Sequence, residues 1–176
     1  EIPINQAQKS DESSLARALQ FGASYFKTLF WLWRFRNSID AADYDLRAFN
    51  SKIYFQRFWQ RSRHKIITNW VRDEMQTLDI GCGSSQILLD LKSAIGLDIR
   101  QNKLRLMRNY GKTVVNGTLF TLPFPDQSFD CVICSEVIEH VRYDEQIYSE
   151  FNRVLRSGGT LILGTPDYGS IIWVAI

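Results

Sequence analysis

The residues best suited to chemistry lie in a glycine turn that follows a short apolar run. Residues 77–80 read Thr-Leu-Asp-Ile, and Gly81 and Gly83 come next. Glycine permits positive φ and lets a ligand approach the backbone without a Cβ in the way. A helix that begins just beyond the glycines would expose unpaired N–H groups, which favour a carboxylate or a phosphate. The segment predicts a ligand-binding loop, although a plain strand-to-helix turn would have the same glycines.

A carboxylate ends the next apolar run. Asp98 follows residues 94–97, at the point where a second parallel strand is expected to stop. A carboxylate in that place accepts hydrogen bonds from ribose hydroxyls, although a helix cap is the simpler explanation of Asp98 alone. Together with the glycine loop, Asp98 favours a nucleoside site. The dinucleotide fingerprint requires glycine where this chain has Gln86, so NAD is disfavoured.

The elements that would position these residues follow an alternating pattern. Short apolar runs at residues 77–80, 94–97, 113–115, 131–134 and 160–163 are separated by helical candidates at 85–91, 101–110 and 145–155. Strands that alternate with helices predict an α/β fold, a Rossmann-like doubly wound parallel sheet. We expect five strands.

The front of the chain differs from the rest in charge and in aromatic content. Residues 21–72 contain ten Lys or Arg and three Asp, a net charge of +7, and thirteen of the 23 aromatic residues lie between positions 21 and 59. Apolar spacings of three and four predict helices over about 14–35 and 54–73. We therefore expect an N-terminal helical extension, residues 1–53, followed by a second domain, residues 54–176.

The overall composition excludes several classes of protein. Apolar residues make up 45% of the chain and charged residues 23%, which is typical of folded globular proteins. No apolar run approaches the roughly 18 residues of a membrane span, and no signal peptide is expected. Three cysteines are too few for a disulfide framework and favour a reducing compartment. We therefore expect the protein to be cytoplasmic.

Several motifs occur in a characteristic order. They are Asp79-Ile-Gly81-Cys-Gly83, Gly96-Leu-Asp98, Leu122-Pro-Phe-Pro-Asp126, Glu136-Val-Ile-Glu139-His140 and Arg153 to Gly159. With these motifs, residues 54–168 resemble the class I S-adenosylmethionine-dependent methyltransferases, in particular the small-molecule, type 11-like group that includes quinone-biosynthesis enzymes. The resemblance implies that residues 54–176 are a methyltransferase domain without the C-terminal β-hairpin of the complete fold. It also implies the strand order 3-2-1-4-5.

The resemblance also implies a cofactor, S-adenosylmethionine, and the residues that hold it. Asp79, Gly81, Cys82 and Gly83 would hold its amino-acid end, and Asp98 its ribose. Ile99, Thr118 and Leu119 would lie beside the adenine, and Ser135 and Glu136 beside the methionine portion. The implied activity is methyl transfer to a small or lipid-like acceptor.

Two residues are candidates for a general base. Glu139 and His140 follow the fourth expected strand, although both would serve equally well to cap or anchor a helix. Cys131 and Cys134 have the spacing of metal ligands, but strand alternation directs them to opposite faces. No metal site is expected.

The aromatic extension leaves several interpretations open. Residues 21–36 could cover a hydrophobic acceptor as a lid, contact an anionic membrane surface, or pack as ordinary core or against another chain. Nucleic-acid binding is not expected, because no RNA-binding motif accompanies the basic residues. Two alternatives to a methyltransferase remain: a non-catalytic nucleotide-binding module, and an NAD-dependent oxidoreductase.

Overall fold

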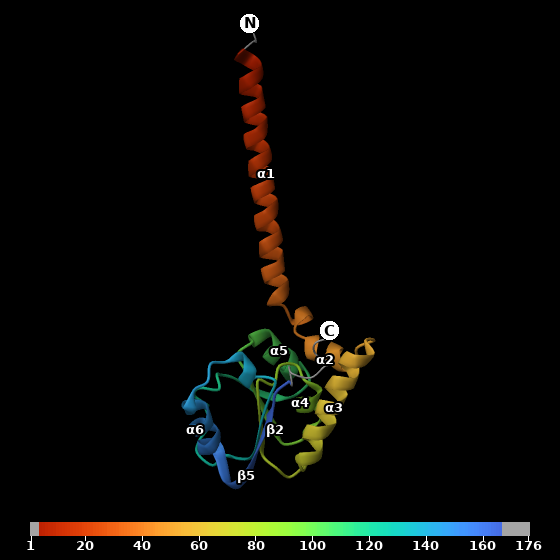
Figure 1. Ribbon diagram of the computed structural model, residues 1–176, viewed down its shortest axis with the longest axis vertical. Coiled ribbons are helices and arrows are strands. Elements are labelled where there is room, and N and C mark those ends of the chain that lie inside the picture. Colours follow the sequence, from red (N-terminus) through yellow and green to blue (C-terminus); the bar gives the residue numbers. More distant parts are fainter. Residues whose placement is uncertain (1–3, 167–176) are drawn as a thin grey trace. The chain divides into compact units, whose positions relative to one another are not determined.

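The computed structural model describes the chain from Ile4 to Pro166, and its side chains from residue 16 onward. Its contacts divide the chain into two compact units, the first ending at Ser38 and the second beginning at Ile39 (Figure 1). The first unit is one long helix, and the second contains the sheet.

The first unit is helix α1, Ile4–Arg36. It begins ten residues before the helix that the sequence predicts, since residues 4–13 include Gln, Ala, Lys and Glu, which favour helix. The helix ends at Arg36, and the side-chain amide of the next residue, Asn37, donates to the carbonyl of Trp33 at 2.8 Å. The described large apolar side chains of α1 are exposed.

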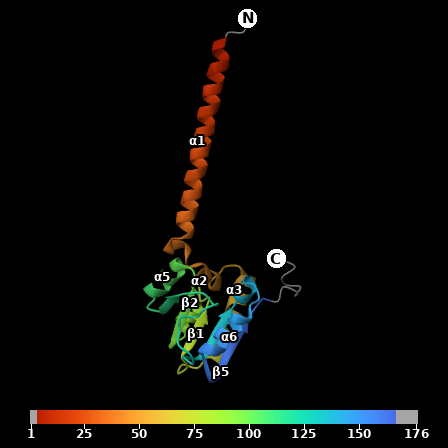
Figure 2. The ribbon, with the colours of Figure 1, turned by 90° about the vertical axis from the view of Figure 1, so that its left-hand side faces the viewer.

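The second unit is built on a parallel sheet (Figure 2). The sheet has five strands in the order β3-β2-β1-β4-β5. The strands are β1 (Thr77–Ile80), β2 (Ala94–Asp98), β3 (Thr113–Asn116), β4 (Phe129–Ser135) and β5 (Leu155–Gly164). The predicted fold class and strand order are confirmed. Because all neighbouring pairs are parallel, the carboxyl ends of the strands share one edge of the sheet.

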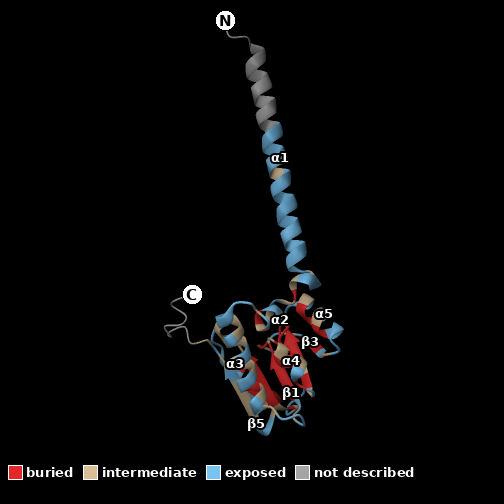
Figure 3. Ribbon diagram, turned by 90° about the vertical axis from the view of Figure 1, so that its right-hand side faces the viewer, coloured by how far each residue is buried: buried red, intermediate tan, exposed pale blue. Residues whose placement is uncertain are grey.

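Helices cover both faces of this sheet. They are η1 (Ile39–Ala41), α2 (Tyr44–Phe49), α3 (Tyr54–Trp70), α4 (Gln86–Asp90), α5 (Gln101–Asn109), η2 (Ile138–His140) and α6 (Glu145–Val154). One face of the sheet packs against α3, α4 and α5, and the other against α6 and the segment around Leu119 and Leu122. Figure 3 shows the buried residues concentrated in the strands between these layers.

The two cysteines of β4 illustrate the two faces. Cys131 belongs to the apolar cluster under α3, α4 and α5, and Cys134 to the cluster under α6. Strand alternation therefore separates the two thiols, as the sequence predicts. Burial raises the pKa of Cys131 to about 11 and that of Cys134 to about 12.

Helix α6 holds the Leu-Pro-Phe-Pro-Asp segment in place. Its apolar residues Ile147, Phe151 and Val154 recur at helical spacing and are buried. From its last turn, the guanidinium of Arg153 donates to the carbonyl of Leu122 at 2.9 Å and to that of Phe124 at 2.8 Å. The hydrogen bonds from Arg153 to these backbone carbonyls therefore hold the conformation of residues 122–126.

Residues 39–53 lie in the same unit as the sheet. The sequence predicts a boundary after residue 53, but Ala42 and Ala48 are buried, and Asp45 on α2 bonds to the turn after β1. These contacts place α2 with the sheet, and α1 alone forms the other unit. A lid or interaction role for the extension stays a prediction.

Candidate functional site

The turn after β1 has the geometry that its glycines predict. Gly81 and Gly83 both adopt positive φ, 68° and 54°. The backbone N–H groups of Gly81 and Cys82 donate to the carbonyl of Leu97, at 2.7 and 3.1 Å, which fixes the turn against the end of β2. Helix α4 begins after Ser85, whose hydroxyl accepts from the N–H of Leu88. The side chain of Cys82 is buried in the core, so only its backbone lies in the loop surface.

Asp98 lies beside this loop at the end of β2. Its Oδ2 accepts from the N–H of Gly83 at 2.8 Å, and its Oδ1 from the N–H of Arg100 at 2.7 Å. The residue is 8% exposed. Each carboxylate oxygen has a further lone pair, so Asp98 can still accept hydrogen bonds from a ligand hydroxyl.

Asp79 is a buried acid on β1 with an incomplete set of partners. Its Oδ2 has no hydrogen-bond partner among residues 16–166, which the structure describes with their side chains. Burial raises the pKa of Asp79 to about 7; the charges of Asp98 and Asp45 add to this effect, and that of Arg63 opposes it. A donor or a cation brought to this oxygen would satisfy it.

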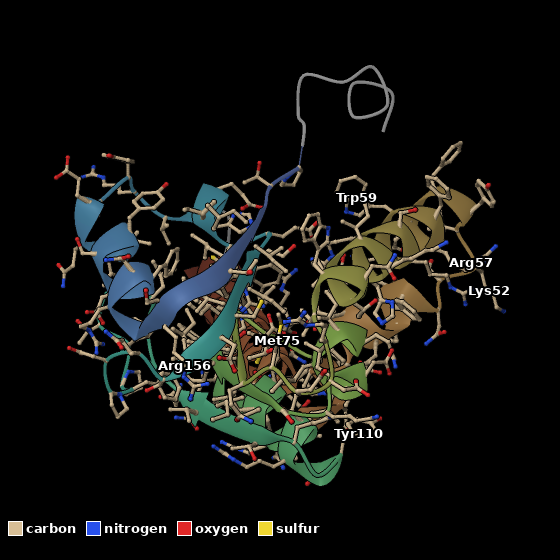
Figure 4. All side chains as sticks on the ribbon, turned by 90° about the horizontal axis from the view of Figure 1, so that it is seen from below. Lys52, Arg57, Trp59, Met75, Tyr110 and Arg156 are labelled. Atoms are coloured by element: carbon tan, nitrogen blue, oxygen red, sulfur yellow. The ribbon has the colours of Figure 1, made fainter. Side chains whose placement is uncertain are left out.

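Two residues from α3 hold the side chain at the end of β4. Trp59 Nε1 donates to Glu136 Oε1 at 2.7 Å, and Arg63 Nη1 to Glu136 Oε2 at 2.7 Å. Glu136 itself has a positive φ of 58°, a conformation that side chains other than glycine rarely adopt. The hydrogen bonds from Trp59 and Arg63 hold Glu136 in this conformation, together with the bond that its own N–H donates to the carbonyl of Gly164. Figure 4 shows Trp59 on the side of α3 that faces the sheet.

Asp45, on α2, also reaches the glycine loop. Its Oδ2 accepts from Ser84 N at 2.8 Å, from Ser84 Oγ at 2.9 Å and from Lys103 Nζ at 2.6 Å. Burial disfavours the charged form, but the charge and hydrogen bond of Lys103 and the bonds from Ser84 outweigh it, so the pKa of Asp45 is lowered. Sequence reasoning missed Asp45, because no motif connects it to a loop 39 residues later.

The residues expected near an adenine lie in different surroundings. Ile99 follows Asp98 and is 67% exposed, and Thr118 is exposed in an antiparallel bridge with Thr121. The side chain of Leu119 belongs to the core under α6, so only its backbone is free to meet a ligand. The structure therefore brings Ile99 and Thr118 to the surface and turns Leu119 away from it.

The candidate residues at the end of β4 and after it also differ in burial. Both carboxylate oxygens of Glu139 are buried, and among residues 16–166 neither has a hydrogen-bond partner. Ser135 Oγ is likewise buried and without a partner in that part of the chain. His140 is exposed. Burial raises the pKa of Cys134, and the charges of Asp79 and Glu139 add to this effect.

A parallel sheet with a glycine turn after β1 and an acid at the end of β2 is the arrangement typical of nucleoside-binding α/β domains. A family model described as a methyltransferase domain matches residues 78–163. Residues 78–163 therefore form a domain similar to those of the class I S-adenosylmethionine-dependent methyltransferases, enzymes whose cofactor is S-adenosylmethionine.

Individual relatives are similar to more than half of this chain. The ubiquinone/menaquinone biosynthesis C-methyltransferase UbiE of Hahella chejuensis is 32% identical over 70% of this chain and 55% of its own length. A sterol 24-C-methyltransferase of Gibberella zeae is 31% identical over 60% of this chain and 31% of its own length. The chain spans about a third to about a half of the length of the curated relatives it matches.

The fold has counterparts among solved structures. A SAM-dependent methyltransferase from Thermotoga maritima superposes with a TM-score of 0.61 and 29% identity, over 68% of this chain and 57% of the other.

The residues of the site fit S-adenosylmethionine. The buried Asp79 Oδ2, which lacks a partner among residues 16–166, suits the ammonium group of the methionine portion. The spare lone pairs of Asp98 suit ribose hydroxyls.

Proposed function

We propose that this chain transfers the methyl group of S-adenosylmethionine to a small or lipid-like acceptor. The observation that carries the proposal is the hydrogen bond of 2.8 Å that the N–H of Gly83 donates to Asp98, because it connects the glycine loop to this acid. The loop and the acid then act as one preformed site. The relatives named for C-methylation in quinone biosynthesis and of sterols support an acceptor of this kind.

The proposed binding roles follow from the surroundings of each residue. Asp79 and the backbone of Gly81, Cys82 and Gly83 would hold the amino-acid end of the cofactor, and Asp98 the ribose. Ile99, Thr118 and the backbone of Leu119 would border the adenine, and Ser135, with its unbonded hydroxyl, the methionine portion. Glu136 would act through its backbone, because Trp59 and Arg63 occupy its carboxylate.

When bound, S-adenosylmethionine supplies an electrophilic methyl group, so the protein mainly aligns the acceptor. We propose Glu139 as the group that takes a proton from the acceptor. Its two buried oxygens have no competing donor among residues 16–166, so they are free to accept an acceptor O–H or N–H. His140 is exposed and would serve at the rim of the site.

We also propose that the protein acts in the cytoplasm. Cys82, Cys131 and Cys134 are all free thiols, and free thiols persist in a reducing compartment. None of the described helices combines the length and apolar character that crossing a membrane requires.

Calorimetric titration with S-adenosylhomocysteine tests the cofactor site. We expect micromolar binding, no binding of NAD, and loss of affinity in Asp98→Ala. Asp126→Ala is the matched control, because Asp126 is an exposed acid outside the glycine loop and pairs with Arg153. A thermal melt of each variant separates lost binding from lost folding.

The outcomes discriminate between the proposed function and its alternatives. Binding of NAD in place of S-adenosylhomocysteine would support an oxidoreductase. Cofactor binding without turnover of quinol, sterol or phenol acceptors, in the full-length protein as well, would leave a non-catalytic module. Formation of S-adenosylhomocysteine with one of these acceptors would establish the methyltransferase.

A further inference from the structure

We propose that the outer face of α3 binds the surface of an anionic lipid membrane, and that α1 is a second, separate lipid-binding segment. The outer face of α3 is defined here as Tyr54, Phe55, Arg57, Phe58, Arg61 and Lys65. This inference goes beyond the proposed function, because lipid binding needs neither cofactor nor turnover. It also names the place from which a lipid-like acceptor would come.

Large apolar rings lie open on this face. Tyr54, Phe55 and Phe58 are each exposed by 58–63%. The rings of Tyr54 and Phe58 stack on each other, with centroids 6.1 Å apart and planes 16° apart. Three exposed rings within five residues of one helix exceed the scattered apolar residues of an ordinary surface, and such patches mark interaction sites.

Positive charge lies along the same face. Arg57, Arg61 and Lys65 recur every four residues, which places them in one row. Among the described residues none of the three forms an ion pair; Arg57 and Arg61 instead donate to the carbonyls of Ser51 and Phe49. Their charge is therefore not neutralised by a neighbouring acid.

The sequence around α3 reinforces this charge. Residues 46–72 contain seven Lys or Arg and no Asp or Glu. Basic residues near an anionic bilayer are attracted to its surface, and their contributions add up. A surface that joins such a charge to exposed aromatic rings is complementary to anionic headgroups above an apolar interior.

The face is also hollowed. Tyr54, Arg57, Phe58, Arg61, Ser62 and Lys65 line an open depression of about 270 Å³. Two guanidinium groups and an ammonium group around aromatic rings suit a phosphate head with an apolar stem. Figure 4 shows Arg57, and Lys52 nearby, directed away from the sheet.

The opposite side of α3 belongs to the candidate active site. Trp59 and Arg63 reach from it to Glu136 at the end of β4. One helix therefore carries the proposed lipid-binding face on one side and a support of the site on the other. A lipid acceptor would travel only the width of this helix between the two.

Helix α1, considered by itself, also combines basic residues with exposed apolar side chains. Residues 17–36 contain four Lys or Arg and no acid. Leu19, Phe26, Phe30 and Trp33 are exposed and share one side of the helix by their spacing. We include residues 21–36 in the proposal as a second lipid-binding segment.

A lipid surface explains these residues better than a nucleic acid does. Single-stranded nucleic acid stacks on aromatic rings and pairs with basic residues, but it makes no use of exposed aliphatic side chains. Ile53 and Ile66 on the second unit, and Leu19, Leu29 and Leu32 on α1, are all exposed. Aliphatic side chains gain free energy on entering the acyl region of a bilayer.

Sedimentation with vesicles tests the proposal. We expect the chain to sediment with vesicles of phosphatidylcholine and phosphatidylglycerol, and to stay in solution with phosphatidylcholine alone. Arg61→Glu with Lys65→Glu should weaken partitioning by at least about tenfold, since each reversal replaces attraction with repulsion. Arg105→Glu with Arg142→Glu is the matched control: both residues are exposed, and the charge change is the same.

The aromatic contribution has its own variants. Phe30→Ser with Trp33→Ser on α1, and Phe58→Ser on α3, should each reduce partitioning, whereas Ser24→Ala on α1 should not. Titration with S-adenosylhomocysteine shows whether each variant keeps its folded cofactor site. Lipid binding with failed cofactor binding, or the reverse, distinguishes this proposal from the proposed function.

Four outcomes would overturn the proposal. One is a chain that stays in solution with anionic vesicles. Another is equal loss of partitioning in the control pair Arg105→Glu with Arg142→Glu. The third is a chain that leaves the vesicles when single-stranded RNA is added, because the face would then bind RNA. The fourth is a dimer, detected by sedimentation equilibrium, that covers the exposed rings, because the face would then bind a second copy of the chain.

Discussion

Asp45 and Lys103 form an ion pair of 2.6 Å although they are 58 residues apart in the chain. The same Asp45 oxygen accepts from the backbone and hydroxyl of Ser84, so α2, α5 and the glycine loop meet at one carboxylate. The loop is thus held from outside the sheet as well as from Asp98 within it.

Removing this carboxylate should destabilise the domain. Asp45→Asn leaves the buried ammonium of Lys103 without its counter-charge, a change that costs about 3 kcal/mol in comparable sites. We expect a lower midpoint of urea unfolding and weaker binding of S-adenosylhomocysteine. Asp73→Asn is the matched control, because Asp73 and Lys92 form the same kind of pair in full exposure, and its midpoint should hardly change. Equal midpoints for both variants would show that the Asp45 pair does not support the loop.

A methyl group at Gly83 should disrupt the loop. Its Cβ would lie 2.5 Å from Asp45 Oδ2, and its φ of 54° is strained for alanine. Gly111→Ala has similar strain, with φ of 76°, but meets nothing within 4 Å. We expect Gly111→Ala to cost about 1 kcal/mol of unfolding free energy, and Gly83→Ala to cost more and to abolish cofactor binding. Thermal melts and calorimetry of the two variants measure the difference, which a purely conformational effect would not produce.

Cofactor binding should strengthen as the pH rises toward neutrality. Because the pKa of Asp79 is raised from 3.8 to about 7, the folded domain holds a proton there that the ionic contact with a ligand ammonium must release. The affinity for S-adenosylhomocysteine should rise by up to about tenfold per pH unit below 7 and then level off. Asp79→Asn should bind weakly at every pH, and an unchanged slope in that variant would assign the effect to another group.

The same shift affects stability in the absence of ligand. An acid whose folded pKa lies above its unfolded value stabilises the fold least when ionised. The contribution of Asp79 is therefore present below about pH 4 and is lost as the pH rises through about 7. Urea unfolding at a series of pH values should show this decline in the native chain and its absence in Asp79→Asn.

Arg63 should set the position of this pH dependence. Its charge lowers the pKa of Asp79, so Arg63→Gln should move the rise in affinity to higher pH. Arg61→Gln, two residues away on the outer face of α3, should leave the rise where it is. Calorimetric titrations between pH 5.5 and pH 8.5 compare the two, and identical profiles would separate Arg63 from Asp79.

Glu139 and His140 should differ as bases. Glu139→Gln should lower the rate of methyl transfer by about a hundredfold or more, while the affinity for S-adenosylhomocysteine stays within about twofold. His140→Gln, at an exposed side chain, should have a small effect on the rate. Initial rates of S-adenosylhomocysteine formation with an accepted acceptor measure both, and a larger loss in His140→Gln would reverse the assignment.

The sheet was predictable from the sequence because its information is local. Each strand is a short apolar run between turns, and each of the five expected runs lies within an observed strand. The strand order follows from the motif resemblance, and the faces of Cys131 and Cys134 from simple alternation. The glycine loop and Asp98 could be found for the same reason, since residue type and spacing alone mark them.

Contacts between distant segments could not be predicted. Asp45 looks like any acid in a basic region, and only the folded chain brings it to Ser84. The bonds from Trp59 and Arg63 to Glu136 depend on how α3 packs beside β4, which no spacing in the sequence encodes. Leu119 was expected beside a ligand, but its apolar side chain gains more from burial in the core.

The strand order also bears on the sequence of events in folding. The glycine loop and Asp98 lie within residues 81–98, and β1, β2 and β3 are consecutive in the chain and paired side by side. Strand β4 must instead return past β2 and β3 to pair with β1, so Thr77 meets Cys131 only after a long loop has closed. On the ribosome, the half of the domain that receives the nucleoside is therefore complete before the half that carries Glu139 has been synthesised.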